Sequence, residues 1–395
     1  MASTAPIPLV PIVDERLKTT SVCLAVGYGS RHDPEGKGGL AHMLEHALMS
    51  APREGGISVS EQVESLGGHA NAETGPESML YYAQVGAADA EAVAGELCRA
   101  VLAPQLTETL LSSEREVVLQ ELAAAEADPA DTVQDAFLAT AFAGHPLGRP
   151  VGGTPAEVAG LTLADVLEGH RNGFLASPRA LVVVGPEIPA SLQHHDAAPA
   201  WPRAGEHLPL PPLDPPEPLR WSTEFSWVCL GGRSPAANSP ERHPYAVLAK
   251  LLGASPTSLL YRAVRGEHGL AYAFQAWSRG YTEAGAWRLL AGVESGNGDK
   301  FLAVVREVLA RVAEQGPLPA DLASARNQAR MSLVLNAENP LERATLTARR
   351  VLVWGPEWSL EEELAALARV TAEQVRQAAE RLACELITVV RPEAR

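Results

Sequence analysis

The chain contains two halves that resemble each other, and this repeat constrains the fold more than any other sequence feature. In the first half, the apolar segment Ser21–Gly29 leads through a polar turn into a helical pattern. In the second half, Phe225–Gly232 leads through a turn with two prolines into a helical pattern at Tyr245–Leu252. Self-similarity on this scale predicts a duplicated α/β unit.

A proline-rich stretch separates the two halves. Residues 186–218 contain ten of the 31 prolines, so this stretch cannot hold a long helix or a central strand. We therefore expect a first half at residues 1–188, a linker at 189–219 and a second half at 220–395.

Hydrophobic periodicity predicts the main elements of each half. The expected strands are Ser78–Gln84, Ala180–Val184, Ala286–Val293 and Ile387–Val390. The expected helices are Ala87–Leu102, Ser112–Ala127, Leu163–Gly173, 299–314, 319–336, 341–352 and 371–383.

Composition excludes several classes of protein. The formal net charge of −16 argues against nucleic acid or an anionic membrane surface as the main partner. The first 18 residues have no basic segment, and three prolines interrupt their apolar stretch. We therefore expect no signal peptide, no membrane-spanning helix and a cytoplasmic location.

The segment His42-Met43-Leu44-Glu45-His46 carries the strongest chemical signal. Two histidines four residues apart project from the same face of a helix, so both imidazoles can reach one zinc ion. The order H-x-x-E-H inverts the commoner H-E-x-x-H signature of zinc proteases.

Two histidines do not complete a zinc site, because catalytic zinc usually takes three protein ligands. The expected helix Ser112–Ala127 opens with a capping box from Ser113 to Glu116 and carries Glu114 and Glu121 two turns apart on one face. Either carboxylate pointing inward would need a partner, and Glu121 as a ligand would supply it. Periodicity alone favours the alternative that both are solvated carboxylates on an amphipathic helix.

These residues belong to a series of motifs that resembles one family. The run Gly38–Met49 looks like the insulinase/pitrilysin family of inverted-zincin peptidases, which includes mitochondrial processing peptidase and related bacterial peptidases. Three further motifs follow in the family's order: Gly67–Thr74, Glu114–Glu121 and His145–Thr154. The resemblance implies an α+β fold of two homologous halves, each a mainly antiparallel sheet covered by helices. It also implies that the halves form a clamshell or a closed dimer chamber.

The resemblance assigns roles within the first half. It implies one Zn²⁺ per chain, bound by His42, His46 and Glu121. It makes Glu45 the general base and Glu114 a supporting residue. It further implies that Asn71 and Ala72 lie on a sheet edge that binds substrate as an added strand.

A motif in the second half is also similar to the family. Arg265 and Tyr272 match its R-x-x-x-G-x-x-Y stretch. The resemblance implies that Arg265 binds the substrate backbone and that Tyr272 stabilises the oxyanion. The structural alternative is that Arg265 caps a helix and that Tyr272 is a half-buried core residue.

The expected function is therefore a zinc endopeptidase that hydrolyses peptides or unfolded segments in an enclosed chamber. The alternatives are a non-catalytic or scaffold member of the same fold, the catalytic chain of a heterodimer, and an unrelated protein with a chance motif. Because one chain carries both the zinc residues and the Arg–Tyr pair, a homodimer is the simplest assembly. We expect no nucleic-acid or membrane partner.

Overall fold

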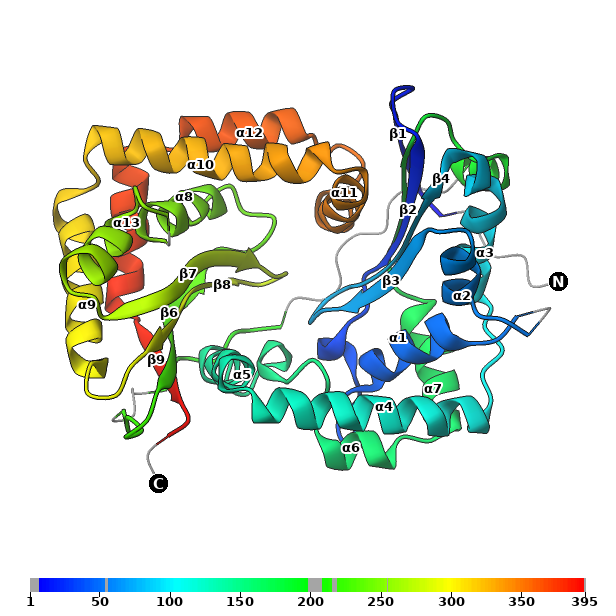
Figure 1. Cartoon of the computed structure of the whole chain (residues 1–395), viewed down its shortest axis with the longest axis horizontal. Coiled ribbons are helices and arrows are strands. Elements are labelled where there is room, and N and C mark those ends of the chain that lie inside the picture. Colours follow the sequence, from blue (N-terminus) through cyan, green and yellow to red (C-terminus); the bar gives the residue numbers. More distant parts are fainter. Residues whose placement is uncertain (1–6, 54–55, 198–207, 215–218, 254, 394–395) are drawn as a thin grey trace. The chain divides into compact units, whose positions relative to one another are not determined.

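The computed structural model divides the chain into two compact units that each combine separate stretches of sequence (Figure 1). It describes residues 7–53, 56–197, 208–214, 219–253 and 255–393. The first unit comprises Met1–Ala123, Arg149–Gly205 and Leu335–Trp358. The second unit comprises Ala124–Gly148, Glu206–Val334 and Ser359–Arg395.

The first unit is built on a five-stranded sheet with the strand order β1-β5-β2-β4-β3. Its strands are β1 (Leu9–Val13), β2 (Thr19–Val26), β3 (His69–Thr74), β4 (Met79–Gly86) and β5 (Arg179–Gly185). Only the β1–β5 pair is parallel among its strand pairs in the described residues. Strand β2 lies at the centre and is buried on both faces, and β3 forms one edge.

On one side of this sheet, α1 (Leu40–Ser50), α2 (Val59–Ser65) and α3 (Ala90–Leu102) contact the strands, and α4 (Glu108–Ala127), α6 (Pro155–Gly160) and α7 (Leu163–Glu168) contribute to the same core. The short helices are η1 (Ser30–His32), η2 (Ala87–Asp89), the π-helix η4 (Gly169–Phe174) and η5 (Ala190–Ala197). Leu24 of β2 and Tyr81 of β4 pack here against Leu44 of α1 and Leu97 of α3.

The second unit contains a four-stranded antiparallel sheet with the order β7-β8-β6-β9. Its strands are β6 (Ser226–Ser234), β7 (Ala271–Gly280), β8 (Gly285–Val293) and β9 (Ile387–Arg391). Its helices are α5 (Pro129–Ala141), α8 (Arg242–Leu252), α9 (Gly298–Gln315), α10 (Pro319–Glu338), α12 (Leu360–Arg369) and α13 (Ala372–Cys384), with η3 (Pro146–Gly148) and the π-helix η6 (Tyr261–Glu267). Trp287 fills the core between this sheet and α8, α9 and α13.

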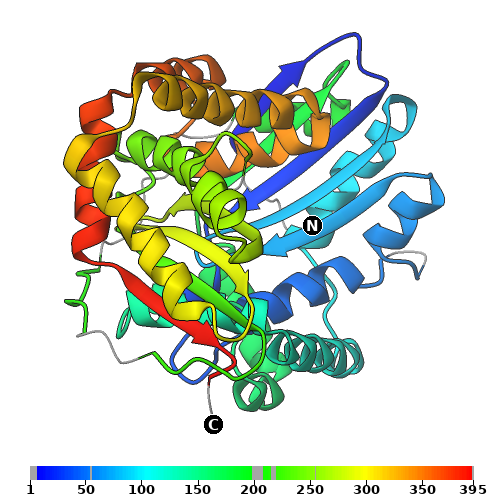
Figure 2. The ribbon, with the colours of Figure 1, turned by 60° about the vertical axis from the view of Figure 1, so that its left-hand side comes forward.

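The two sequence halves exchange a helix. Helix α11 (Pro340–Trp354) comes from the second half but covers the free face of the first sheet, beside β2 and β5 (Figure 2). Helix α5 comes from the first half but packs on β6 and β9 of the second sheet. Each compact unit therefore contains residues from both expected halves. The expected division into residues 1–188, 189–219 and 220–395 remains a proposal about the organisation of the sequence.

The expected architecture of two helix-covered, mainly antiparallel sheets is confirmed. The expected strands and helices are present with shifted ends, but α4 begins earlier than expected. Ser113 therefore lies inside α4, where its hydroxyl donates to the Thr109 carbonyl at 3.2 Å. The predicted capping box from Ser113 to Glu116 is wrong, because neither residue lies at the start of the helix. Among the described residues, the helices are too short or too polar to cross a membrane.

Candidate metal centre

Helix α1 is held at its N-terminus by a buried carboxylate. Asp33 accepts hydrogen bonds at 2.9 Å from the backbone nitrogens of both Gly39 and Ala41. Gly39 has a φ of 84°, and a Cβ there would lie 2.4 Å from the Gly152 carbonyl oxygen, so only glycine fits. Asp33 therefore binds helix donors that would otherwise lack partners and fixes where α1 begins.

The sequence of α1 determines which face it buries. Met43, Leu44 and Leu48 are fully buried against the sheet. His42 and His46 lie on another face, with ring centroids 4.8 Å apart and side chains only 18% and 15% exposed. The i, i+4 spacing thus brings the two imidazoles together, as the motif predicted.

Glu121 of α4 completes a cluster with these two rings. Its Oε2 lies 3.5 Å from His42 Nε2 and 3.3 Å from His46 Nε2. Ligand atoms at about 2.0–2.2 Å from a tetrahedral zinc are separated by about 3.4 Å. Two imidazole nitrogens and a carboxylate oxygen at these separations therefore fit a zinc ion in both chemistry and spacing.

Glu114 contacts the opposite side of His46. Its Oε2 lies 3.2 Å from His46 Nδ1, and its side chain is only 14% exposed. A proton on Nδ1 can donate to this carboxylate, which leaves the Nε2 lone pair directed toward Glu121. The two glutamates, two turns apart on α4, therefore contact different atoms of the same imidazole.

On the rest of α4, Val118 is buried, but Val117 is 42% exposed and does not pack in the core. Glu116 is exposed, because its position on the helix differs from the face shared by Glu114 and Glu121.

Glu45 lies on α1 beside the cluster and contacts strand β3. The Thr74 hydroxyl donates a hydrogen bond to Glu45 Oε2. Burial raises the pKa of Glu45 above its usual range, although the hydrogen bond from Thr74 opposes this shift. Burial, reinforced by the nearby His46, lowers the pKa of His42 to about 4, so the His42 ring is neutral at physiological pH and could bind a metal ion.

Asn71 and Ala72 lie on β3, which pairs with β4 alone among the described residues. Asn71 is exposed, and its side-chain oxygen accepts from the Ala72 backbone nitrogen at 2.8 Å. Ala72 packs into the core beneath α1. The position of both residues on an edge strand agrees with the expectation, whereas their substrate-binding role remains a prediction.

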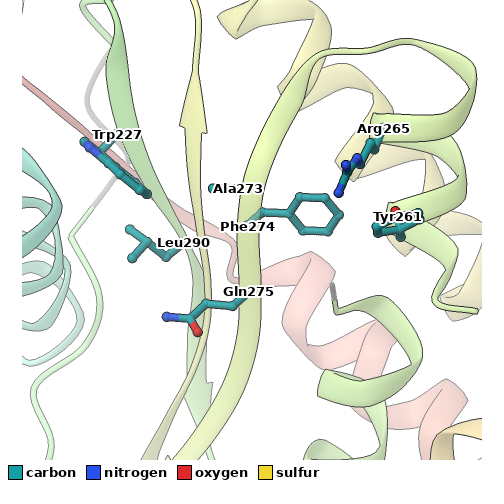
Figure 3. Close-up of a pocket in the computed structure, with 7 residues that line it drawn as sticks. All are labelled: Trp227, Tyr261, Arg265, Ala273, Phe274, Gln275 and Leu290. Atoms are coloured by element: carbon teal, nitrogen blue, oxygen red, sulfur yellow. The ribbon is translucent and has the colours of Figure 1, made fainter. Parts of the chain in front are cut away.

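Arg265 and Tyr272 belong to the second unit. Arg265 lies on η6, with its guanidinium carbon 5.1 Å from the centre of the Tyr261 ring. It lines an open pocket of about 290 Å³, where Figure 3 shows Arg265, Tyr261 and Phe274 on one side of β7. Tyr272 lies on β7, but its side chain is outside the described residues. The expected catalytic roles of Arg265 and Tyr272 at the metal site remain a prediction.

Sequence reasoning missed two residues of the site. Thr74 ends the motif Gly67–Thr74, but the motif does not show which way its side chain points. The alternation of side chains along β3 directs its hydroxyl toward Glu45. Asp33 lies in the polar turn before α1, and an aspartate there is a common capping signal. Its distance from Leu40 does not match the usual capping spacing, so the signal was weak.

Comparison with known proteins identifies the family. Residues 10–155 match the family described as Insulinase (Peptidase family M16), and residues 190–329 match the Peptidase M16 inactive domain. The chain belongs to the M16 peptidase family. The resemblance to insulinase-type peptidases is therefore confirmed.

Similar proteins come from several bacteria. An uncharacterised zinc protease of Streptomyces coelicolor is 30% identical over 368 residues, covering 89% of this chain and 80% of the relative. Another uncharacterised zinc protease, from Mycobacterium tuberculosis, is 30% identical over 381 residues, covering 92% and 86%.

Solved structures share the M16 fold. A protease from Helicobacter pylori has a TM-score of 0.83 and 19% identity, covering 100% of this chain and 98% of its own. A chain of Complex III2 from Candida albicans has a TM-score of 0.81 and 18% identity, covering 99% and 95%. Similarity at this level of identity shows the fold alone.

Proposed function

We propose that the chain is a zinc-dependent endopeptidase that hydrolyses peptides or unfolded segments. The main support is the convergence of His42 Nε2, His46 Nε2 and Glu121 Oε2, in a chain of the M16 family. These three residues would hold one Zn²⁺ per chain, and Glu114 would orient His46. The names of the relatives as zinc proteases agree with this metal.

Glu45 is the proposed general base. Bound zinc would supply Lewis acidity, which acidifies a water molecule and polarises a peptide carbonyl. Glu45 accepts the proton of the attacking water and later delivers it to the leaving amine. Burial raises the pKa of Glu45, which makes its carboxylate a stronger base for the first transfer. Thr74 holds the Glu45 carboxylate in place, because its hydroxyl donates a hydrogen bond to Oε2.

The proposed substrate site is the edge of β3 away from β4, where none of the described strands pairs. An extended peptide can add to an unpaired strand edge through backbone hydrogen bonds, and Asn71 and Ala72 lie in this strand. Arg265 would bind the substrate backbone and Tyr272 would donate to the developing oxyanion, a contact typically worth about 3 kcal/mol.

The proposed assembly is a homodimer with two zinc sites, located in the cytoplasm. One chain carries both the zinc cluster and the Arg265–Tyr272 pair, so it does not need an unlike subunit to supply either. A heterodimer with a related chain is the alternative assembly. Sedimentation equilibrium of the purified chain distinguishes them: a fully active zinc-loaded monomer would contradict the dimer.

A non-catalytic role is the alternative function. A chain of Complex III2 has the same fold, so this fold also occurs as part of a larger complex. The presence of His42, Glu45, His46 and Glu121 together favours the enzyme, because a scaffold has no need for a metal and a base.

A peptide library read by mass spectrometry tests the proposal. We expect about one zinc per chain by elemental analysis and cleavage that stops with chelator and returns with added zinc. A purified chain that binds zinc but leaves the whole library intact would favour the scaffold role. A chain that binds no zinc would contradict the metal site.

A further inference from the structure

Strand β3 presents different side chains to the two faces of the first sheet. Ala72 belongs to the core beneath α1, and Thr74 donates to Glu45 on the same side. Glu73 lies between them and points to the opposite face, because side chains alternate along a strand. The structure agrees, since Leu80, the partner of Glu73 on β4, packs against α11.

On that opposite face, Glu73 forms an ion pair with α11. The Arg349 guanidinium donates from Nη2 to Glu73 Oε2, across 276 residues of sequence. Both side chains are about two-fifths exposed, at 37% and 40%, so their ion pair adds little to the stability of the whole fold.

The apolar contacts of α11 lie elsewhere on the sheet. Ala344, Ala348 and Val351 pack on residues of β2, β4 and β5. These contacts hold α11 without involving β3. The ion pair between Arg349 and Glu73 therefore also connects α11 to the edge strand β3. This strand has one neighbouring strand among the described residues.

We infer that Arg349 is a positioning residue for β3, and through Thr74 for the carboxylate of Glu45. An edge strand is held by fewer backbone hydrogen bonds than an inner strand and opens more easily. The ion pair restrains β3 at Glu73, the residue next to Thr74, and the Thr74 hydroxyl aligns the Glu45 carboxylate. This inference rests on the proposed endopeptidase function, because it assigns the pair a consequence for catalysis.

The test compares Arg349→Met with Arg343→Met in the full zinc-loaded chain. Arg343 lies on α11 but has its electrostatic contact with Asp14, so its loss removes the same charge away from β3. The first readout is amide hydrogen exchange at residues 69–74 of β3 and 179–185 of β5. The second is kcat and KM on a peptide that the wild type cleaves.

For Arg349→Met we expect faster exchange in β3, unchanged exchange in β5, an unchanged melting temperature and a kcat about 3- to 10-fold lower, because small displacements at a catalytic site are costly. We expect Arg343→Met to match the wild type and Arg349→Lys to recover most of the lost kcat. Glu73→Gln combined with Arg349→Met should be no worse than either single change, because the two residues act as one unit.

Two outcomes would overturn the inference: unchanged exchange and unchanged kcat, or faster exchange in β3 and β5 together. The second would mean that Arg349 only anchors α11. If the wild type cleaves nothing while Arg349→Met still loosens β3 alone, the restraint on β3 stands and the proposed endopeptidase function falls.

Discussion

At the residue scale, the chemistry of the cluster depends on how two glutamates of one helix are exposed. Glu121 is 51% exposed and reaches the Nε2 atoms of both histidines, whereas Glu114 is 14% exposed and reaches Nδ1 of His46. The imidazole atoms that they contact distinguish the proposed ligand, Glu121, from Glu114, which is proposed to orient His46. Glu45 is a third carboxylate with a separate partner, Thr74.

Changing Glu114 to Gln should weaken zinc binding without abolishing it. Loss of a carboxylate partner for a histidine ligand typically costs about 10- to 100-fold in metal affinity. Competition with a zinc-binding dye measures the dissociation constant. Glu116→Gln is the matched control, because Glu116 is on the same helix but exposed. Equal affinities in both variants would remove Glu114 from its supporting role.

Changing Glu45 to Gln should abolish cleavage while zinc stays bound. Glu45 is not one of the three residues whose ligand atoms converge, so the metal content should remain near the wild-type value. General-base catalysis contributes about 100- to 10,000-fold, so kcat should fall by at least about 100-fold. Elemental analysis and a peptide assay on the same sample check both statements. Cleavage at the wild-type rate would exclude Glu45 as the base.

At the element scale, the helices around the site are positioned by buried polar contacts. Asp33 caps α1, and His170 joins η4 to the end of α3 through a 2.9 Å contact between its Nε2 and the Val101 carbonyl. His170 also stacks on Phe174. Such contacts make the arrangement of helices sensitive to protonation, because a buried ring cannot take up a proton without cost.

The stability of the first unit should fall in mild acid because of His170. Burial lowers the pKa of His170 below its ordinary value of 6.5. As the pH falls below that value, the unfolded chain takes up a proton that the folded chain does not, so the free energy of unfolding decreases. His170→Gln should reduce this decrease between pH 7.5 and 5.5 in urea titrations. His268→Gln, which changes an exposed histidine, serves as the control. Its free energy of unfolding should depend on pH as in the wild type. The same pH dependence of the free energy of unfolding in all three proteins would contradict the role of His170.

At the scale of the whole molecule, each sheet depends on a helix from the other half of the sequence. Helix α11 covers Cys23, Leu80 and Val182 of the first sheet, and Phe137 of α5 covers Cys229 of the second. Without these helices, each half would expose a contiguous apolar face, which proteins avoid because it promotes aggregation.

The two halves should therefore fail to fold when produced separately. We expect fragments 1–205 and 206–395 to be insoluble or to lack cooperative unfolding, and we expect their co-expression to yield soluble complex. Size-exclusion chromatography and thermal unfolding provide the measurement. A soluble, cooperatively unfolding fragment 1–205 would show that α11 is dispensable for the first sheet.

The sequence by itself determined the local parts of this protein. The i, i+4 spacing of His42 and His46 placed both rings on one helical face, and strand and helix periods placed most elements correctly. The resemblance to a family assigned roles to Glu121 and Glu114. Periodicity alone could not distinguish these roles from those of solvated surface carboxylates. These features are readable because they depend on contacts within a few turns of one element.

Only the tertiary structure decided which distant residues meet. It brought Thr74 to Glu45, Asp33 to the start of α1 and Arg349 to Glu73, and it exchanged α5 and α11 between the sequence halves. Such pairs leave no periodic trace in the sequence, because the packing of whole elements determines them. A helix pattern shows that α11 has an apolar face, but not which sheet that face will cover.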